Sequence, residues 1–505
     1  MTASIARATG SADAEADVAA GFASGVTRGV VTAGAQAARA AINGKTHSAR
    51  AEVFTGTVYA GPGHFPEPRS RKPEKRIFRV LAAEALGPQP SADFGPFDAC
   101  FRLTPSAWFE GLGKLPRPRV RQLPGRAPRR ATVPRVMDVI ALREQFPVTG
   151  EMTFLNNAAQ CPLCLPVRER VEAFLDLAAR SPDRRPAARH PLRLLLARVL
   201  GGAPEEFALV TSTGVGIGFA AAGYPWAPGD NVVLPADEHW NNTFPWLALR
   251  ERGVDVRIVP VGADQRVHPD LVAERVDGHT RMLAVAAVRH TTGYRADLKA
   301  LSRIAHDRGA LFVVDGVQAA GVVPLNVVED GIDVLAGAGF KWLLGMHGTG
   351  YLYVRQGVWD RIHPIMPGMF AAEDDLHEIR WLPGAQRYET GSLAYALFHA
   401  WTAGLEMILE IGVPAIHARV LDLTDRLLAG LRAQGVLVVT PADAREERSA
   451  IVSFTAGSDK ANQALHTRLV EQNIAVALRG GRIRVSPSFY NTEEEIDRLL
   501  AALRA

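Results

Sequence analysis

Short apolar runs alternate with helix-periodic segments along the chain from about residue 151 onward. The runs, at 207–210, 231–234, 255–259, 281–288 and 311–314, are rich in valine, leucine and isoleucine. Near-continuous apolar runs of this length are typical of strands that are buried on both faces of a parallel sheet. Between two of them, Leu298, Leu301 and Ala305 share one face of a predicted helix. The alternation predicts an α/β fold whose mostly parallel sheet is covered on both sides by helices.

The pattern changes after about residue 390. A long helix is predicted over 394–411, and a different succession of short strands and helices follows it. Thr492 and Glu495 have the spacing of a capping box, which predicts the start of the last helix. We therefore expect a large domain over 137–390 and a smaller C-terminal α/β domain over 391–505. The first residues after 137 could belong to the small domain instead of the large one.

Residues 1–136 have a different composition, rich in arginine, proline and alanine. The stretch 115–136 holds seven Arg and five Pro and no acidic residue. Proline interrupts helices and sheets and like charges repel, so this stretch is expected to be extended and solvated. We interpret 1–136 as a disordered extension, or as the product of a start codon assigned too early with Met137 as the true start. The alternative is a basic arm that binds nucleic acid or an acidic partner.

Bulk composition narrows the class of protein. The chain has 505 residues, of which 47% are hydrophobic, and a net charge of only +4, so nucleic acid is not an expected partner. Three cysteines do not form a disulfide framework, and a reducing cytoplasm is the expected compartment. The sequence has no apolar run of about 18 residues and no secretory h-region, so no membrane association is expected.

One lysine stands out as a candidate catalytic residue. The chain has seven Lys, and only Lys299, Lys341 and Lys460 follow Met137. The neighbours of Lys341, in Gly-Ala-Gly-Phe-Lys-Trp-Leu-Leu-Gly (337–345), are small or apolar. Desolvation lowers the pKa of an amine and makes it a nucleophile toward carbonyl groups. Lys299 lies on the polar side of a predicted helix and is expected to be solvated.

A carboxylate and a glycine-rich turn complete a possible cofactor site. Asp315 ends the apolar strand 311–314, where it could keep a pyridine nitrogen protonated, as pyridoxal phosphate (PLP) requires. The turn 211–218 joins a strand to a helix, whose free amides could hold a phosphate. The same turn also fits a weak dinucleotide fingerprint, with Asp237 or Glu238 as the ribose-binding acid. A phosphate of PLP is favoured because it also accounts for Lys341 and Asp315.

Together these motifs resemble the class V aminotransferases, a fold-type I family of PLP-dependent enzymes. The resemblance runs from about Met137 to the C-terminus. It rests on Asp-Gly-Val-Gln-Ala-Ala-Gly (315–321), Asp333, Lys341 and Gly-x-x-Gly-x-Gly (345–350). The family includes cysteine desulfurases, selenocysteine lyases, kynureninases and isopenicillin N epimerase-like proteins. The resemblance implies a large PLP-binding domain, a small C-terminal domain and a homodimer.

The resemblance also implies roles for individual residues. Lys341 would hold PLP as an aldimine and then act as the base at the α-carbon of an amino acid. Around the cofactor, Asp315 would face the pyridine nitrogen, His239 the ring, Gln318 the phenolic oxygen, and Thr213 and Gly214 the phosphate, while Thr390 would reach the phosphate of the neighbouring subunit. For the substrate, Arg484 would bind the α-carboxylate, with Asn157 and Ala158 bordering the site. Arg482, on the same strand face as Arg484, matches no family ligand.

Several positions depart from the family pattern. Arg289 and His290 stand where a Gln or Asn is usual, and either could face the cofactor. Residues 338–340 read Ala-Gly-Phe where many desulfurases have Ser-Gly-His. No cysteine follows Cys164, so the persulfide-forming cysteine of a desulfurase is missing. Cys161 and Cys164 form a lone CxxC, which is weak support for zinc, and no metal site is expected.

The expected function is therefore PLP-dependent chemistry on an α-amino acid. We favour a β-elimination of the cysteine or selenocysteine lyase type without a persulfide cysteine. Transamination and epimerisation remain open, because all three begin by removal of the same proton. An NAD-dependent oxidoreductase and a nonenzymatic binding module are the alternatives from other classes.

Overall fold

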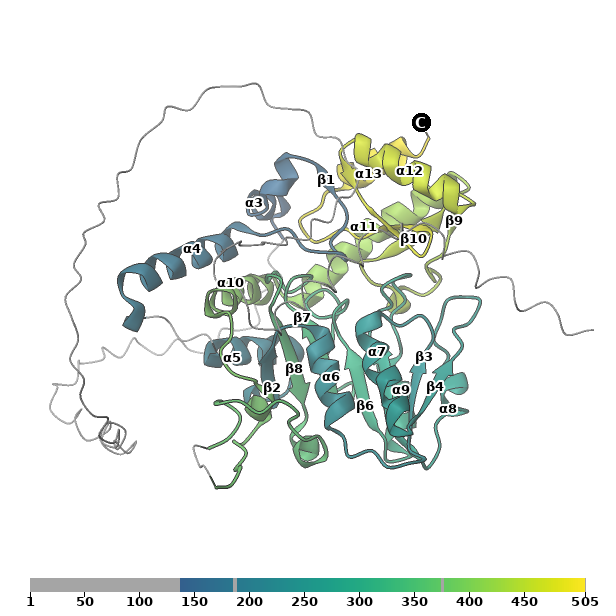
Figure 1. Cartoon of the computed structure of the whole chain (residues 1–505). Coiled ribbons are helices and arrows are strands. Elements are labelled where there is room, and N and C mark those ends of the chain that lie inside the picture. Colours follow the sequence, from purple (N-terminus) through teal and green to yellow (C-terminus); the bar gives the residue numbers. More distant parts are fainter. Residues whose placement is uncertain (1–136, 185–188, 374–376, 505) are drawn as a thin grey trace, which may run out of the picture. The chain divides into compact units, whose positions relative to one another are not determined.

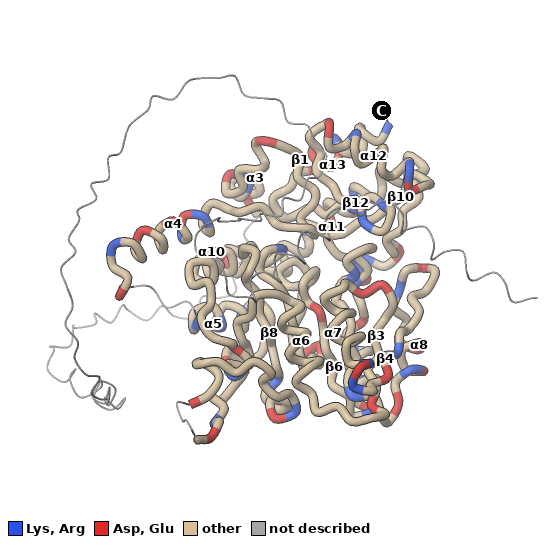
Figure 2. The backbone as a smooth tube through the Cα atoms, viewed as in Figure 1, with Lys and Arg blue, Asp and Glu red and all other residues tan. Residues whose placement is uncertain are grey.

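The computed structural model describes residues 137–184, 189–373 and 377–504 (Figure 1). The interpretation of residues 1–136 therefore lies outside the described residues. Charged residues of both signs are interspersed along the described chain (Figure 2). In this part of the chain no single helix is long and apolar enough to cross a membrane, and one pair of helices that passes this test jointly is bent by 78°.

The largest sheet of the described chain has seven strands. Its strands are β2 (Phe207–Val210), β3 (Asn231–Pro235), β4 (Asp255–Val259), β5 (Thr280–Ala286), β6 (Leu311–Asp315), β7 (Val334–Ala338) and β8 (Gly350–Val354). They lie in the order β2-β8-β7-β6-β5-β3-β4. Only β8 is antiparallel to its neighbours, and the other adjacent pairs are parallel. The expected mostly parallel sheet is confirmed.

Except in the edge strand β4, which is partly exposed, both faces of this sheet are buried, because alternate residues of each strand enter different cores. In β6, Leu311 and Val313 share a core with Ile217 of the helix α6 (Thr213–Gly223), whereas Phe312 shares the opposite core with Leu301 of α9 (Leu298–His306). The helices of this region are α5 (Arg189–Leu200), α6 (Thr213–Gly223), α7 (Phe244–Leu247), α8 (Pro269–Ala273), α9 (Leu298–His306) and α10 (Tyr395–Ile411). Two-sided burial explains why the strands are almost continuously apolar.

The C-terminal part has its own sheet and its own core. Its elements are α11 (Val413–Ala433), β9 (Leu437–Val438), β10 (Val452–Thr455), α12 (Asp459–Glu471), β11 (Ile474–Ala475), β12 (Ala477–Arg479), β13 (Arg482–Val485) and α13 (Glu493–Ala502). Four strands form an antiparallel sheet in the order β12-β13-β10-β9. Leu427, Phe454 and Leu499 are buried together in the core between this sheet and the helices.

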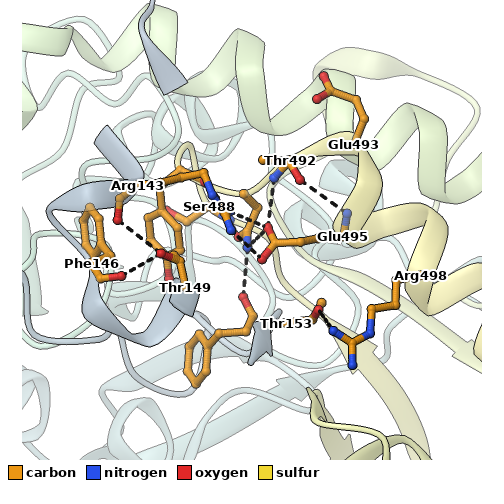
Figure 3. A network of polar contacts seen from close by, with 12 residues as sticks. Arg143, Phe146, Thr149, Thr153, Ser488, Thr492, Glu493, Glu495 and Arg498 are labelled. Carbon is orange, nitrogen blue, oxygen red and sulfur yellow. Dashed lines mark hydrogen bonds and ion pairs between the residues drawn. The ribbon is translucent and has the colours of Figure 1, made fainter. Parts of the chain in front are cut away.

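The first described residues are tied to this C-terminal part. They form α3 (Val139–Glu144), the 3-10 turn η1 (Pro147–Gly150), β1 (Thr153–Phe154) and α4 (Leu165–Arg180). Strand β1 pairs in parallel with β11. Figure 3 shows Arg143 reaching Glu495, the carboxylate of the capping box that begins α13, at 2.9 Å. The capping box predicted at Thr492 and Glu495 is thus present, and it also anchors the start of the described chain.

Candidate active site

The sheet order brings four candidate residues to one edge. Asp315 is the last residue of β6, Lys341 follows β7, His290 follows β5, and His239 follows β3. Since β7, β6, β5 and β3 are successive parallel strands, their carboxyl ends meet at the same edge. Along this edge Asp315 lies between the lysine on one side and the two histidines on the other.

A tight loop between β7 and β8 buries Lys341. The amide of Gly345 donates to the carbonyl of Gly339 at 2.8 Å, which closes the loop. A Cβ atom on Gly339 would lie 2.4 Å from the hydroxyl of Thr349, so a side chain at this position would not fit. The side chain of Lys341 is only 8% exposed. Burial lowers the pKa of its amine, the charge of Asp315 acts in the opposite direction, and Arg484 and Arg479 lower the pKa as well, so that the net value is about 8.

Asp315 is a buried carboxylate next to this lysine. Its Oδ1 accepts a hydrogen bond of 2.9 Å from the amide of Val317. Burial raises its pKa to about 6, although the amide of Val317 and the charge of Lys341 lower it. A cationic group brought against Asp315 would favour its ionised form. The carboxylate is therefore suited to face a protonated ring nitrogen.

Two histidine rings lie on the side of Asp315 opposite to Lys341. The rings of His239 and His290 meet edge to face, with centroids 5.1 Å apart. The Nδ1 of His239 accepts a hydrogen bond from the amide of Asn241, so its proton is on Nε2. Burial lowers the pKa of both imidazoles, that of His290 to about 4. Both rings are therefore neutral near pH 7.

The N-terminus of α6 offers donors for a phosphate. Ser212 is the N-cap, and its hydroxyl accepts from the amide of Val215 at 3.2 Å. Thr213 is buried in the first turn. The side chain of Asn241 lies 3.2 Å from where a Cβ atom would be on Gly214, so the loop after β3 packs closely over this turn. Free amides and a favourable dipole at such a turn attract anions.

Gln318 is held at both ends of its carboxamide. Its Nε2 donates to the carbonyl of Ala158 at 3.0 Å, and its Oε1 accepts from the indole of Trp342 at 2.9 Å. One N–H remains available for a ligand. The side chain of Asn157 is already engaged within the protein. Its Nδ2 donates to the carbonyl of Ser486, and its Oδ1 accepts from the hydroxyl of Tyr490.

The strand β13 contributes a buried arginine. Arg484 is 2% exposed, and its Nη1 donates to the carbonyl of His290 at 2.8 Å. Its Nε is buried without a hydrogen-bond partner among the described residues. Burial lowers the pKa of this guanidinium to about 10, and Arg479 adds to the effect. A buried cation with an unused donor is poised for an anionic ligand, because an unpaired buried charge is costly.

These side chains enclose a cavity of about 270 Å³. It is lined by Ala158, Ala159, Ser212, Thr213, His239, Trp240, Asn241, His290, Asp315, Val317, Gln318, Ala338, Phe340, Lys341, Arg479 and Arg484. Seven residues predicted from sequence are thus brought together: Lys341, Asp315, His239, Thr213, Gln318, Arg484 and Ala158. Gly214, Asn157 and Thr390 are not among the lining residues. Ser212, Trp240, Asn241 and Arg479 were missed, although Ser212 and Trp240 adjoin predicted residues in sequence.

The structure distinguishes the two residues that depart from the family pattern. His290 lines the cavity, and Arg289 does not. Arg289 pairs with Asp237 at 2.6 Å and donates to the carbonyl of Gln265. The carboxylate of Glu238 accepts from the amides of Ala286 and Asn242. Both acids of the proposed dinucleotide fingerprint are therefore already engaged within the protein, and the structure does not support that alternative.

Thr390 directly follows Glu389, a buried residue with several polar contacts. Glu389 is fully buried, pairs with Arg193 at 2.5 Å and accepts from the amide of Leu209 at 2.9 Å. Thr390 itself is exposed in the single chain. Its expected contact is with a neighbouring subunit, so it stays a prediction.

The residues of the cavity fit PLP. A lysine of lowered pKa suits the aldehyde, a buried carboxylate suits the pyridine nitrogen, and a helix N-terminus suits the phosphate. The buried, unpartnered Nε of Arg484 leaves a donor for an acid group of the substrate. Among the described residues, no group of three His, Cys, Asp or Glu side chains could hold a metal ion.

Comparisons with known proteins identify the family of this chain. The family model described as Aminotransferase class-V matches residues 187–499. A probable cysteine desulfurase of Methanothermobacter thermautotrophicus is 29% identical over 389 residues, which cover 71% of this chain and 95% of the relative. The isopenicillin N epimerase of Streptomyces clavuligerus is 31% identical over 380 residues, covering 70% of this chain and 94% of the relative.

Solved structures share the fold. The apo cysteine desulfurase of Thermococcus onnurineus NA1 superposes with a TM-score of 0.67 at 24% identity, covering 72% of this chain and 96% of that structure. A cystine C–S lyase, C-DES, in complex with cysteine persulfide has the same TM-score and identity, with 71% and 99% covered. The expected fold-type I architecture is confirmed. The chain belongs to the class V aminotransferase family of PLP-dependent enzymes.

Proposed function

We propose that the enzyme catalyses β-elimination from a cysteine- or selenocysteine-like α-amino acid. The observation that carries this proposal is the short hairpin before Arg484. Strands β12 and β13 are joined by Gly480 and Gly481, both with positive φ, and this turn holds no cysteine. A tight hairpin supplies no nucleophile to accept a sulfur atom from the substrate.

The remaining cysteines of the described chain do not replace that nucleophile. Cys161 and Cys164 are buried, at 3% and 0% exposure. Burial raises the pKa of both thiols, and a thiol rather than a thiolate is a poor nucleophile. A reaction in which sulfur leaves directly, without transfer to the protein, fits this arrangement better than persulfide formation.

The side chains of the site support each requirement of such an elimination. Arg484 binds the α-carboxylate and orients the substrate. The bound cofactor supplies an electron sink for the charge that develops at the α-carbon. The amine of Lys341 takes the α-proton, and Asp315 keeps the ring nitrogen protonated. The electron pair then forms the Cα–Cβ double bond while the Cβ–S bond breaks, and the sulfur leaves with the bonding pair.

Product analysis tests this proposal. The purified enzyme with PLP is incubated with L-cysteine, and pyruvate, ammonia, sulfide and alanine are quantified. We expect pyruvate and sulfide in equal amounts. Alanine in place of pyruvate would mean that sulfur is transferred to an acceptor, and the proposal would then be wrong.

Epimerisation is a second candidate, and the position of the histidines favours it over transamination. His239 and His290 line the cavity on the side of Asp315 opposite to Lys341. Inversion at the α-carbon needs a proton donor on the face opposite to the base, and a neutral imidazole could fulfil this role. An amino acid incubated with the enzyme in ²H₂O would then be recovered intact. Loss of its optical rotation together with incorporation of deuterium would support epimerisation.

A further inference from the structure

A second cavity adjoins the one that contains Lys341. It has a volume of about 500 Å³ against about 270 Å³ for the first. Three residues, Trp240, His290 and Arg479, line both cavities, so these side chains form their common wall. No step of the proposed elimination uses this second cavity.

Apolar side chains from three elements line it. Leu234 is the penultimate residue of β3 and is fully buried, Leu247 ends α7, and Ile258 lies on the edge strand β4. Trp240 is 63% exposed. Exposed apolar surface next to an active site is a usual mark of a ligand-binding groove.

The polar rim of this cavity is fixed by the protein. Asp237 has a left-handed backbone, with φ of 61°, and its carboxylate accepts from Arg289 at 2.6 Å and from Thr291 at 2.8 Å. A non-glycine residue in this conformation persists where the surroundings hold it. Arg479 differs from these residues, because its guanidinium has no hydrogen bond or ion pair within the described chain. It is free to contact a ligand, including the face of an aromatic ring.

We propose that this second cavity, defined by Leu247, Ile258 and the shared Trp240 and Arg479, binds the side chain of the substrate. The substrate is then an S-substituted L-cysteine with an apolar, ring-sized group on sulfur. This inference rests on the proposed elimination, in which a thiolate that carries its own substituent leaves without needing a cysteine acceptor. The Arg484 contact fixes the α-carboxylate, and the side chain extends past His290.

The reaction balances without an oxidant or reductant. The α-proton leaves to Lys341, the Cβ–S bond breaks with its electron pair on sulfur, and the thiolate takes up a proton. One water molecule hydrolyses the resulting enamine to pyruvate and ammonium. The net change is one S-substituted cysteine and one water giving a thiol, pyruvate and ammonium.

Two measurements on the PLP-loaded enzyme test the inference. The first compares kcat/KM for S-phenyl-L-cysteine and L-cysteine by pyruvate release. The second compares binding of L-homophenylalanine and L-alanine by calorimetry. L-Homophenylalanine has a carbon in place of the sulfur, so it occupies the site without eliminating. We expect the aromatic compound to be preferred in both, by roughly tenfold or more.

Filling the cavity should remove that preference. Ile258 is 38% exposed on an edge strand and lines only the second cavity, so Ile258→Trp is expected to fold. The matched control is Val328→Trp, at a 67% exposed position that lines neither cavity. Ile258→Trp should weaken L-homophenylalanine binding and leave L-alanine binding unchanged, and Val328→Trp should change neither. Ile258→Phe is the milder substitution should the tryptophan impair folding.

The outcomes separate this inference from the proposed function. Equal binding of L-homophenylalanine and L-alanine by the unaltered enzyme would overturn the inference, whatever the variants do. Pyruvate from L-cysteine together with that result would leave the elimination standing. A tenfold binding preference without pyruvate from any substrate would support the side-chain site and overturn the elimination.

Discussion

Arg484 and Arg482 are two residues apart on β13, yet they have different surroundings. Arg484 is buried, lines the cavity beside Lys341 and has an unused Nε donor. Arg482 is partly exposed, and its side chain contacts Gln265 at 3.4 Å outside that cavity. A charge that is removed from water and left unpaired gains most from an anionic ligand. The two residues therefore allow a comparison of the same side chain on the same strand.

Arg484→Ala should weaken amino-acid binding and leave PLP binding nearly unchanged. The lost contact is a charge-assisted hydrogen bond, worth roughly 1.5–3 kcal/mol, so the dissociation constant should rise about 10- to 100-fold. Titration with L-alanine, followed by the visible absorption of the cofactor, gives this constant. Arg482→Ala is the control. Equal weakening by both substitutions would show that the strand face as a whole, and not Arg484, binds the carboxylate.

At the scale of elements, the start of α13 depends on one carboxylate. Glu495 accepts from the amide of Thr492 at 2.9 Å, from Asn491 at 2.9 Å and from Arg143 at 2.9 Å (Figure 3). It is 8% exposed. The same side chain thus caps a helix and joins the first described helix to the last one.

Glu495→Ala should lower the free energy of unfolding by roughly 1.5–3 kcal/mol, the value of a hydrogen bond to a charged group. Glu494 precedes it in α13 and is exposed, so Glu494→Ala should change stability by less than about 0.5 kcal/mol. Urea unfolding of both variants measures the difference. Similar losses in both would mean that helix propensity, and not the network of Figure 3, determines the effect.

The elements of the central sheet could be predicted because burial on both faces leaves an unambiguous apolar run. The run 311–314 became β6, with Asp315 at its end, and the run 207–210 became β2 with the same bounds. Lysine scarcity and apolar neighbours were sufficient to single out Lys341. The position of Arg479 could not be predicted, because only the hairpin between β12 and β13 brings it to the cavity, and one more arginine among 50 gives no local signal.

Long-range hydrogen bonds and ion pairs determine which side chains face the cavity, and the sequence alone does not show these contacts. Arg289 and His290 are adjacent in the chain, and the ion pair with Asp237 turns Arg289 away from the cavity. Asn157 is a polar residue beside the cavity, but Ser486 and Tyr490 occupy its amide group. Such long-range partners come from elements more than a hundred residues away, or from a neighbouring strand, and have no periodic pattern in the sequence.

At the scale of the whole molecule, the described chain from residue 137 onward contains every residue of the candidate site. The family match begins at residue 187. We propose that the chain folds as a large domain over 137–390, to which the first residues need not belong, and a small one over 391–505. Family membership sets aside the nonenzymatic binding module that the basic composition of 115–136 suggested.

Deletion of residues 1–136 should leave folding and PLP binding intact, because the site and its three cores are built from later residues. Thermal unfolding and the visible spectrum of the truncated enzyme test this. An insoluble or colourless product would show that the N-terminal residues contribute to the fold. Partial loss of amino-acid turnover with full PLP content would instead assign them a role beyond folding.

A homodimer is the expected active form. Thr390 is exposed and follows the buried, ion-paired Glu389, so its side chain is accessible to a neighbouring subunit. A two-fold arrangement would make both sites reciprocal. Sedimentation should give twice the mass of the chain, and Thr390→Val should weaken PLP binding without dissociating the dimer. A monomer that retains PLP and turnover would contradict this expectation.

The central claim is that Lys341 carries the cofactor, and borohydride reduction tests it most directly. Reduction makes the link between PLP and its lysine permanent, and mass spectrometry of the digested protein then locates the adduct. We expect one adduct per chain, on Lys341, because it is the buried lysine of the described chain whose pKa is lowered, to about 8. Lys299 lies on the exposed side of α9. An adduct on Lys299 or Lys460, or a protein that acquires none, would contradict this account.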